Sequence, residues 1–171
     1  MVLIRKASLR DIQALSKRFL DYLADKNSRL YQENVVRFGI PEEYVRRALA
    51  EEPLMKAVTS GEATFYIALE ENELVGFAQI IQQDVKTAEQ DLIVVFPSHE
   101  RKGIGTHLLK HVVENAKIKD IRMIIVNAGK NEDHARRFYE KNGFKLMKES
   151  TIDTPWGKKL SLATYQLQLS P

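Results

Sequence analysis

Residues 94–106 of the 171-residue chain read VVFPSHERKGIGT. An apolar run typical of a buried strand ends at Val95, a short basic loop follows, and Gly103 and Gly105 begin an amphipathic helix. Backbone N–H groups in the first turn of a helix have no acceptor within the helix, and the helix dipole adds partial positive charge there. Glycine lets a ligand approach this backbone closely, because it carries no side chain. The stretch therefore predicts a site for an anion such as a phosphate.

Two standard phosphate-binding motifs do not fit this spacing. A Walker loop requires Gly-x-x-x-x-Gly-Lys-Ser/Thr, and a Rossmann fingerprint requires Gly-x-Gly-x-x-Gly. Counted from Gly103, the third glycine of the Rossmann pattern falls on Leu108. A tight strand-to-helix turn, in which glycine only relieves strain, is the structural alternative to phosphate binding.

The rest of the chain alternates between strand and helix patterns. Apolar and β-branched runs predict strands over residues 2–6, 63–69, 74–82, 87–95, 121–126, 144–150 and 160–169. Helical periodicity predicts helices over residues 8–23, 41–49, 103–116 and 131–142. The strand–helix–strand order over residues 92–126 is a βαβ unit with parallel strands, and residues 63–82 form an antiparallel hairpin. The sequence thus predicts an α/β fold with a mixed, mostly antiparallel central sheet, flanked by helices, and one parallel βαβ unit.

Four local patterns make sharper predictions. Ser8 and Asp11 have the spacing of a capping box at the start of the first helix. Pro41 suits the first position of the second helix. The apolar face of that second helix is predicted to consist of Tyr44, Val45, Ala48 and Leu49. The apolar run over residues 92–95 is typical of a strand that is buried on both faces.

Size and charge limit the classes of function. The length fits a single domain over residues 1–171. A net charge of +3, without a basic stripe, gives no support for a nucleic-acid partner. Residues 61–98 hold seven acidic residues and one basic residue, which hints at a cationic substrate. No apolar stretch approaches the roughly 20 residues of a membrane span, and the N-terminal apolar run is too short for a signal peptide, so we expect a cytoplasmic protein that does not bind membranes.

The sequence gives no support for a metal site. The chain has no cysteine, which excludes a disulfide framework, a thiolate metal site and a cysteine nucleophile. His107 and His111 are four residues apart, as zinc ligands can be, but no third ligand accompanies them. We therefore expect no metal.

Two segments resemble the GNAT acetyltransferase superfamily. Residues 94–109 are similar to the loop of that family that binds the pyrophosphate of acetyl-CoA. The family pattern Gln/Arg-x-x-Gly-x-Gly/Ala falls on residues 100–105, with Glu100 where the family has Gln or Arg. Residues 131–144, NEDHARRFYEKNGF, resemble the family segment Asn-x-x-Ala-x-x-x-Tyr-x-x-x-Gly-Phe. Both segments occur in the family's order and structural context, so the resemblance covers nearly the whole chain.

The resemblance implies an N-acetyltransferase that uses acetyl-CoA as cosubstrate and lets a primary amine attack the thioester directly. The residues implied to bind acetyl-CoA are Ile93, Val94, Val95, Arg101, Lys102, Gly103, Ile104, Gly105, Thr106 and Asn131. Tyr139 matches the family tyrosine that protonates the departing thiolate, and a core tyrosine is the structural alternative. For Asn131 the structural alternative is a helix N-cap.

The general base and the acceptor stay open at this point. Many family members use a glutamate on the strand before the loop, which makes Glu89 the first candidate. Asp91 shares the strand face of Glu89 if the alternation is regular, and a water chain is a third option. The acceptor is a small-molecule amine or a peptide, and a homodimer is compatible with the family. A non-catalytic module that binds CoA or acyl-CoA and regulates a partner is the alternative function.

Overall fold

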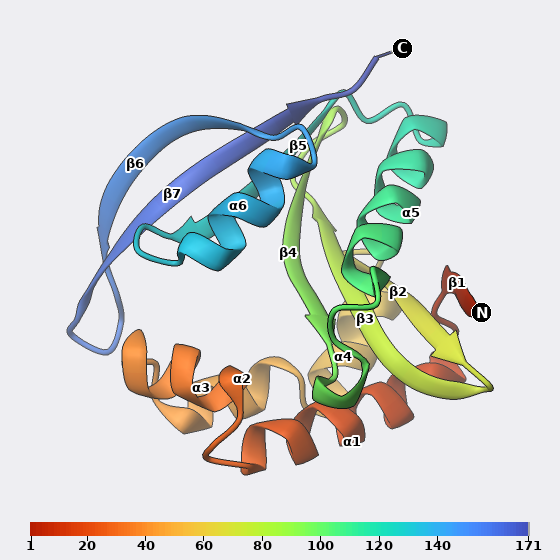
Figure 1. The fold of residues 1–171 in the computed structure, drawn as a ribbon, viewed down its shortest axis with the longest axis horizontal. Helices are drawn as coiled ribbons and strands as arrows, with labels where there is room; N and C mark the ends of the chain where they lie inside the picture. The colour runs from red at the N-terminus through yellow and green to blue at the C-terminus, as the bar shows by residue number, and fades with distance from the viewer. Residues whose placement is uncertain (171) are drawn as a thin grey trace.

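Within residues 1–170, which the computed structural model describes, seven strands form one sheet in the order β1-β2-β3-β4-β5-β7-β6 (Figure 1). Of the six neighbouring pairs in this part of the chain, five are antiparallel and β4 with β5 is parallel. The predicted mixed, mostly antiparallel sheet with one parallel βαβ unit is therefore confirmed. The strands are β1 (Val2–Lys6), β2 (Ala63–Glu70), β3 (Glu73–Gln82), β4 (Thr87–Val95), β5 (Met123–Gly129), β6 (Lys145–Asp153) and β7 (Lys159–Gln168).

Helices cover both faces of this sheet (Figure 1). They are α1 (Leu9–Ala24), α2 (Arg29–Tyr31), the π-helical segment η1 (Gln32–Arg37), α3 (Glu42–Ala48), α4 (Glu51–Thr59), the 3-10 turn η2 (Pro97–His99), α5 (Ile104–Ile118) and α6 (Asp133–Lys141). Tyr66 packs with α5 and α6, whereas its neighbours Phe65 and Ile67 pack with α1 and α4. Successive side chains of a strand point to opposite faces, so the two core clusters lie on opposite sides of the sheet. None of the helices within residues 1–170 has the length and apolar character that crossing a membrane requires.

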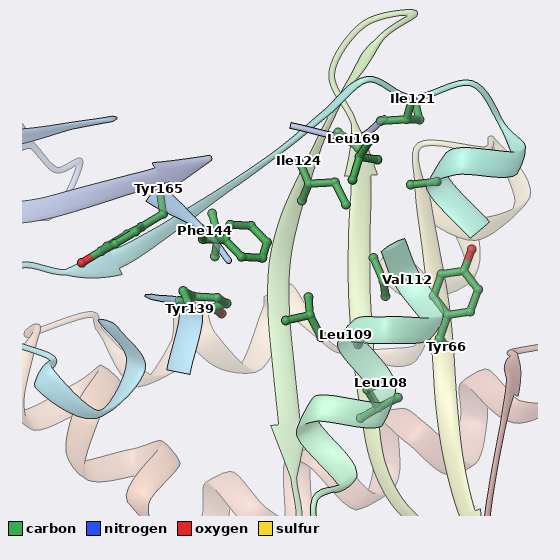
Figure 2. Packing of buried hydrophobic residues seen from close by; sticks show 14 of the residues in the cluster. Tyr66, Leu108, Leu109, Val112, Ile121, Ile124, Tyr139, Phe144, Tyr165 and Leu169 are labelled. Carbon is green, nitrogen blue, oxygen red and sulfur yellow. The ribbon is translucent and has the colours of Figure 1, made fainter. Parts of the chain in front are cut away.

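The core on the α5 side fixes the helix that carries the glycine-rich turn. Figure 2 shows Leu108, Leu109 and Val112 of α5 lying against the strands. Their exposed fractions are 2% or less, and full burial of a leucine side chain contributes roughly 1.5–3 kcal/mol. The predicted apolar stripe of this helix is confirmed at these positions. Packing of α5 therefore holds its N-terminus at one fixed place beside β4.

The region before β2 contains more helices than the two predicted. The Ser8–Asp11 capping box is confirmed, with the Asp11 carboxylate accepting from the Ser8 N–H at 2.6 Å. Pro41 precedes the first helical residue of α3 instead of occupying it. The short helix α4 is an addition, and Pro53 fits its first turn, where a missing N–H costs nothing. The predicted apolar face of this helix is confirmed in part, since Leu49 is buried in the core and Val45 packs against it. Tyr44 and Ala48 are exposed, so that side of the predicted face does not face the core.

Strands β4 and β5 stay paired only at their beginnings. Their register runs from Thr87 opposite Met123 to Glu89 opposite Ile125, and beyond these residues the strands separate (Figure 1). Of the four residues over 92–95, only Val94 is buried. The prediction that this run is buried on both faces is wrong, because the separation opens a cavity along it.

A β-bulge interrupts β4 at Asp91. Ile80 of β3 lies opposite Gln90 and Gln79 lies opposite Leu92, so Asp91 has no partner residue. A bulge breaks the alternation of side chains and bends the strand. The expectation that Glu89 and Asp91 lie on one face by regular alternation therefore does not hold.

The side chain of Gln90 stabilises this bulge. Gln90 is 1% exposed, and its Nε2 donates to the carbonyl oxygens of Gln79, at 2.9 Å, and Leu92. These are carbonyls next to the irregular pairing. A buried carbonyl left without a donor costs about 1–3 kcal/mol.

Replacing Gln90 by leucine should lower the free energy of unfolding by about 2 kcal/mol, because its hydrogen bonds to both buried carbonyls are lost. Urea unfolding followed by circular dichroism measures this change. The matched control is Gln82→Leu, since Gln82 is an exposed glutamine of the neighbouring strand whose amide donates to Asp84 O. Exposed substitutions of that kind change stability by about 0.5 kcal/mol at most. Equal losses in the two variants would show that Gln90 does not support the bulge.

Candidate functional site

A cavity of about 640 Å³ opens where β4 and β5 separate. Its walls come from β4, β5, the beginning of α5, α6 and the α2–η1 segment. Small-molecule sites in proteins typically occupy about 300–1,000 Å³. The cavity is therefore large enough for a cofactor-sized ligand, or at least for its reactive part.

The N-terminus of α5 supplies backbone donors to this cavity. Gly103 precedes the helix with φ +80°, a conformation that favours glycine. The first N–H to bond within this turn is that of His107, which donates to Gly103 O at 3.1 Å. The N–H groups of Ile104, Gly105 and Thr106 therefore lack an intrahelical acceptor, and all three residues line the cavity. This arrangement fits an anion at the helix N-terminus.

The separated part of β4 presents a free strand edge. Residues 92–95 pair with β3, but the pairing with β5 ends at Glu89. Peptide groups on that edge can bind an extended ligand that carries amide groups, as an added strand would bind. Ile93, Val94 and Val95 line the cavity beside this edge.

Most of the residues predicted to bind the cofactor lie around this one cavity. The lining includes Ile93, Val94, Val95, Arg101, Gly103, Ile104, Gly105 and Thr106. Lys102 and Asn131 are outside the lining that the described residues form. Lys102 Nζ lies 3.8 Å from Glu70 Oε2, and the Asn131 carbonyl accepts from Arg37 Nη2 at 2.6 Å.

Glu132, rather than Asn131, occupies the N-cap of α6. Its Oε1 accepts from the Gly129 N–H at 2.8 Å, and the residue lines the cavity. The alternative prediction of Asn131 as a helix N-cap is therefore wrong. Counted back from Ala135, the pattern Asn-x-x-Ala also reaches position 132. The asparagine position of the motif is thus filled by a glutamate.

Glu100, which departs from the family pattern, pairs with an arginine far away in the sequence. Its Oε1 lies 3.6 Å from Arg29 Nη1. The same Arg29 nitrogen lies 3.4 Å from His134 Nε2 of α6. Arg29 therefore joins the loop before α5 to α6 and offsets the charge of Glu100. Sequence reasoning had no signal for this pair, because 71 positions separate its members.

Tyr139 lies between the core and the cavity. Its ring packs on Phe144, with ring centroids 5.5 Å apart, and the residue is 9% exposed. It also lines the cavity. Burial, and then the charges of Glu132 and Asp91, raise the pKa of the Tyr139 hydroxyl to about 12. The phenol therefore stays protonated at neutral pH and remains a hydrogen-bond donor.

Asp91 lies in the bulge and lines the cavity, and the residue remains exposed to solvent. Desolvation by the surrounding protein, and then the charge of Glu89, raise the pKa of the Asp91 carboxyl. Carboxylates whose pKa moves toward neutrality are suited to accept protons in catalysis.

Glu89 holds a neighbouring side chain and does not line the cavity. Its Oε1 accepts from Asn127 Nδ2 at 3.1 Å, and its Oε2 accepts from Gln83 Nε2 at 3.0 Å. Thr164 Oγ1 donates to Asn127 Oδ1 at 2.6 Å, so Asn127 is fixed from both sides. Asn127 lines the cavity, and its polar side chain directly after the apolar run 124–126 was a signal that the sequence analysis missed.

Comparison with known families agrees with this geometry. The sequence pattern of the acetyltransferase (GNAT) family matches residues 21–144. The chain therefore belongs to the GNAT family of acetyltransferases. It is similar to the Bacillus subtilis (strain 168) protein named uncharacterized N-acetyltransferase YsnE, with 31% identity over 85 residues. That match covers 48% of this chain and 56% of YsnE, so the chain spans about half of that relative.

Solved structures share the fold over the whole chain. A GNAT-family acetyltransferase from Desulfovibrio desulfuricans superposes with a TM-score of 0.74 and 19% identity, covering 99% of this chain and all of that one. The Salmonella typhimurium acetyltransferase yncA, whose structure includes its cofactor acetyl-CoA, gives a TM-score of 0.71 and 17% identity, covering 100% of this chain and 95% of that one. At such identities the likeness shows the GNAT fold alone.

Proposed function

We propose that the protein is an acetyl-CoA-dependent N-acetyltransferase in which a primary amine of a small molecule or peptide attacks the thioester directly. One observation carries the proposal. A single cavity joins the three free N–H groups at the start of α5, the free edge of β4, and the side chains of Asp91 and Tyr139. Family membership and the acetyl-CoA bound to yncA support it.

The chain's own residues divide the binding of the cosubstrate between them. The N–H groups of residues 104–106 hold the diphosphate, with Arg101 adding positive charge at the same end. The free edge of β4 hydrogen-bonds the amides of the extended arm. When bound, acetyl-CoA supplies an acetyl group activated as a thioester.

Asp91 and Tyr139 handle the protons. Asp91 accepts a proton from the substrate ammonium, which leaves a neutral amine able to attack. Tyr139 donates a hydrogen bond to the sulfur as charge develops there. Complete transfer of the phenol proton is uphill, because a thiol has a pKa near 8.5, well below that of Tyr139. Tyr139 therefore stabilises the departing sulfur mainly as a donor.

Thiol release tests the function. Free CoA should appear in the presence of acetyl-CoA and an amine panel, and mass spectrometry should find an acetylated amine. Acetyl-CoA binding without turnover for every amine class would reject the enzyme and favour a non-catalytic CoA-binding module.

The Tyr139→Phe variant should reduce kcat roughly 100-fold, since one hydrogen bond to the developing charge is lost. Its Kd for acetyl-CoA should stay within about twofold of the wild-type value, because the ring and its packing remain. Tyr66→Phe is the matched control, since Tyr66 is a buried tyrosine outside the cavity lining. A wild-type kcat in Tyr139→Phe would remove Tyr139 from the mechanism.

A further inference from the structure

A second cavity, of about 340 Å³, adjoins the first. The two cavities share five lining residues: Leu30, Asn34, Ile40, Asp91 and Leu92. The shared carboxylate of Asp91 therefore lies at the boundary between them. The second cavity does not reach the α5 N-terminus, so its lining contains none of the residues that we assign to the diphosphate.

Aromatic and aliphatic side chains form most of the second cavity. Phe19 lies in its wall, with 2% of its surface exposed. Tyr44 of α3 and Trp156 of the β6–β7 turn also line it, and their ring centroids are 5.7 Å apart at 44°. The strand turn and the helical segment also meet at Gly39, where a Cβ would collide with the Lys158 side chain. Distant parts of the chain thus build a largely apolar chamber, which is open to solvent on the side where Tyr44 and Ala48 are exposed.

The charge of this chamber is limited to one carboxylate. Among the described residues that line it, Asp91 is the charged one, and Asn34 and Gln79 are neutral polar residues. An isolated charge in apolar surroundings costs several kcal/mol unless it is paired. A substrate with a second ammonium, or with a carboxylate, would leave that group without a counterion in the chamber.

We propose that this second cavity is the acceptor pocket, and that it takes an aromatic primary monoamine such as an arylalkylamine. This inference rests on the function proposed above. The ammonium pairs with Asp91 while the aromatic body lies among Phe19, Tyr44 and Trp156. A dry cavity of 150 Å³ can hold benzene, so about 340 Å³ suits a phenylethyl or indolylethyl body.

Asp91 accepts one proton from the ammonium, and the nitrogen lone pair forms a bond to the acetyl carbon. The carbon–sulfur bond breaks with its electron pair on sulfur. The second nitrogen proton is lost and one proton ends on sulfur, so the products are an N-acetyl arylalkylamine and the free thiol of CoA.

A substrate panel tests the proposed class. 2-Phenylethylamine and tryptamine should be acetylated with kcat/KM at least 100-fold above spermidine, L-phenylalanine and a peptide with an N-terminal phenylalanine. Spermidine adds positive charge and phenylalanine adds a carboxylate, and the chamber has no counterion for either beyond Asp91. The peptide adds a polar chain that the apolar wall does not pair. Higher kcat/KM for any of these three would overturn the pocket assignment and leave the acetyltransferase function standing.

Two variants with opposite effects on the chamber complete the test. Trp156→Ala removes an aromatic wall, and Ala48→Phe places a ring in the chamber from an exposed helical position. Both should raise KM for 2-phenylethylamine at least tenfold while the calorimetric Kd of acetyl-CoA stays unchanged, because neither residue lines the first cavity. The controls are Asp153→Ala on the same hairpin and Ala14→Phe on α1, which lie outside both linings.

The outcomes separate the two proposals. Unchanged KM in both variants, with the arylalkylamines still turned over, would refute the acceptor pocket alone. Absence of turnover with every amine, despite acetyl-CoA binding, would refute the proposed function and this inference with it. If Trp156→Ala fails to fold, Ala48→Phe still decides between these results.

Discussion

A Gly105→Glu variant should lose measurable affinity for acetyl-CoA while keeping its fold. A Cβ at position 105 would meet Phe138 and Val95 at 3.7–3.8 Å, which are ordinary contacts, so a side chain can be added without a clash at the backbone. The added carboxylate would stand where we place the diphosphate. At an effective dielectric constant of 20, two unit charges 4 Å apart repel by about 4 kcal/mol, which corresponds to roughly a 1,000-fold rise in Kd.

The fold should tolerate this substitution. An acidic side chain in the first turn of a helix is stabilising by about 0.3–1 kcal/mol, so the melting temperature should not fall. The matched control is Gly105→Ala, which adds the Cβ without the charge and should weaken binding far less. Calorimetric titration with acetyl-CoA measures both variants. An unchanged Kd in Gly105→Glu would place the diphosphate elsewhere.

Asp91→Asn should reduce kcat by about 100- to 10,000-fold, the range that a general base supplies. Its Kd for acetyl-CoA should change little, because the N–H groups of α5 are untouched. The wild-type kcat/KM should rise with pH as Asp91 ionises, and the midpoint should lie above the usual aspartate range, because burial and Glu89 raise this pKa. In Asp91→Asn, kcat/KM should lack this rise, which is the acidic limb of the pH profile.

Asp91→Asn should lower activity without lowering the stability of the fold. A carboxyl whose pKa is raised by folding destabilises the folded state at pH values above that pKa, where it is ionised. Asp91→Asn should therefore be at least as stable as the wild type at pH 7. If Asp91→Asn instead lost activity because it unfolds, its stability at pH 7 would be lower than that of the wild type.

Glu89→Gln distinguishes the two carboxylates. If Asp91 is the base, removing the charge of Glu89 should shift the acidic limb of the pH profile to lower pH, since Glu89 contributes to the raised pKa of Asp91. The limb itself should persist. Loss of the limb in Glu89→Gln, with normal activity in Asp91→Asn, would assign the base to Glu89.

Sequence periodicity predicted the sheet well because its strands carry strong local patterns. The predicted bounds of β1 and β4 agree with the structure, and the β2–β3 hairpin follows from the turn at residues 71–73. Gly143 follows α6 with φ +91°, which is the left-handed conformation expected after a helix end. These features depend on neighbours along the chain, and a single sequence shows them directly.

The remaining features depend on contacts between distant residues. No local pattern shows that Glu100 meets Arg29, or that β4 bulges at Asp91. The apolar face of α3 illustrates the difficulty further, since Tyr44 and Ala48 have the spacing of core residues but line a cavity. Periodicity shows that a face is apolar, whereas the tertiary fold decides whether protein or ligand covers it.

The segment from Leu30 to Asn34 gives the two cavities a common wall. Asn34 Nδ2 donates to Leu30 O at 2.9 Å within this segment, and both residues line both cavities. We expect a displacement of this wall on binding in one cavity to change the other cavity, which would link occupancy of the two thermodynamically. Such linkage is reciprocal. If one substrate changes the affinity of the second by some factor, the second changes the affinity of the first by the same factor.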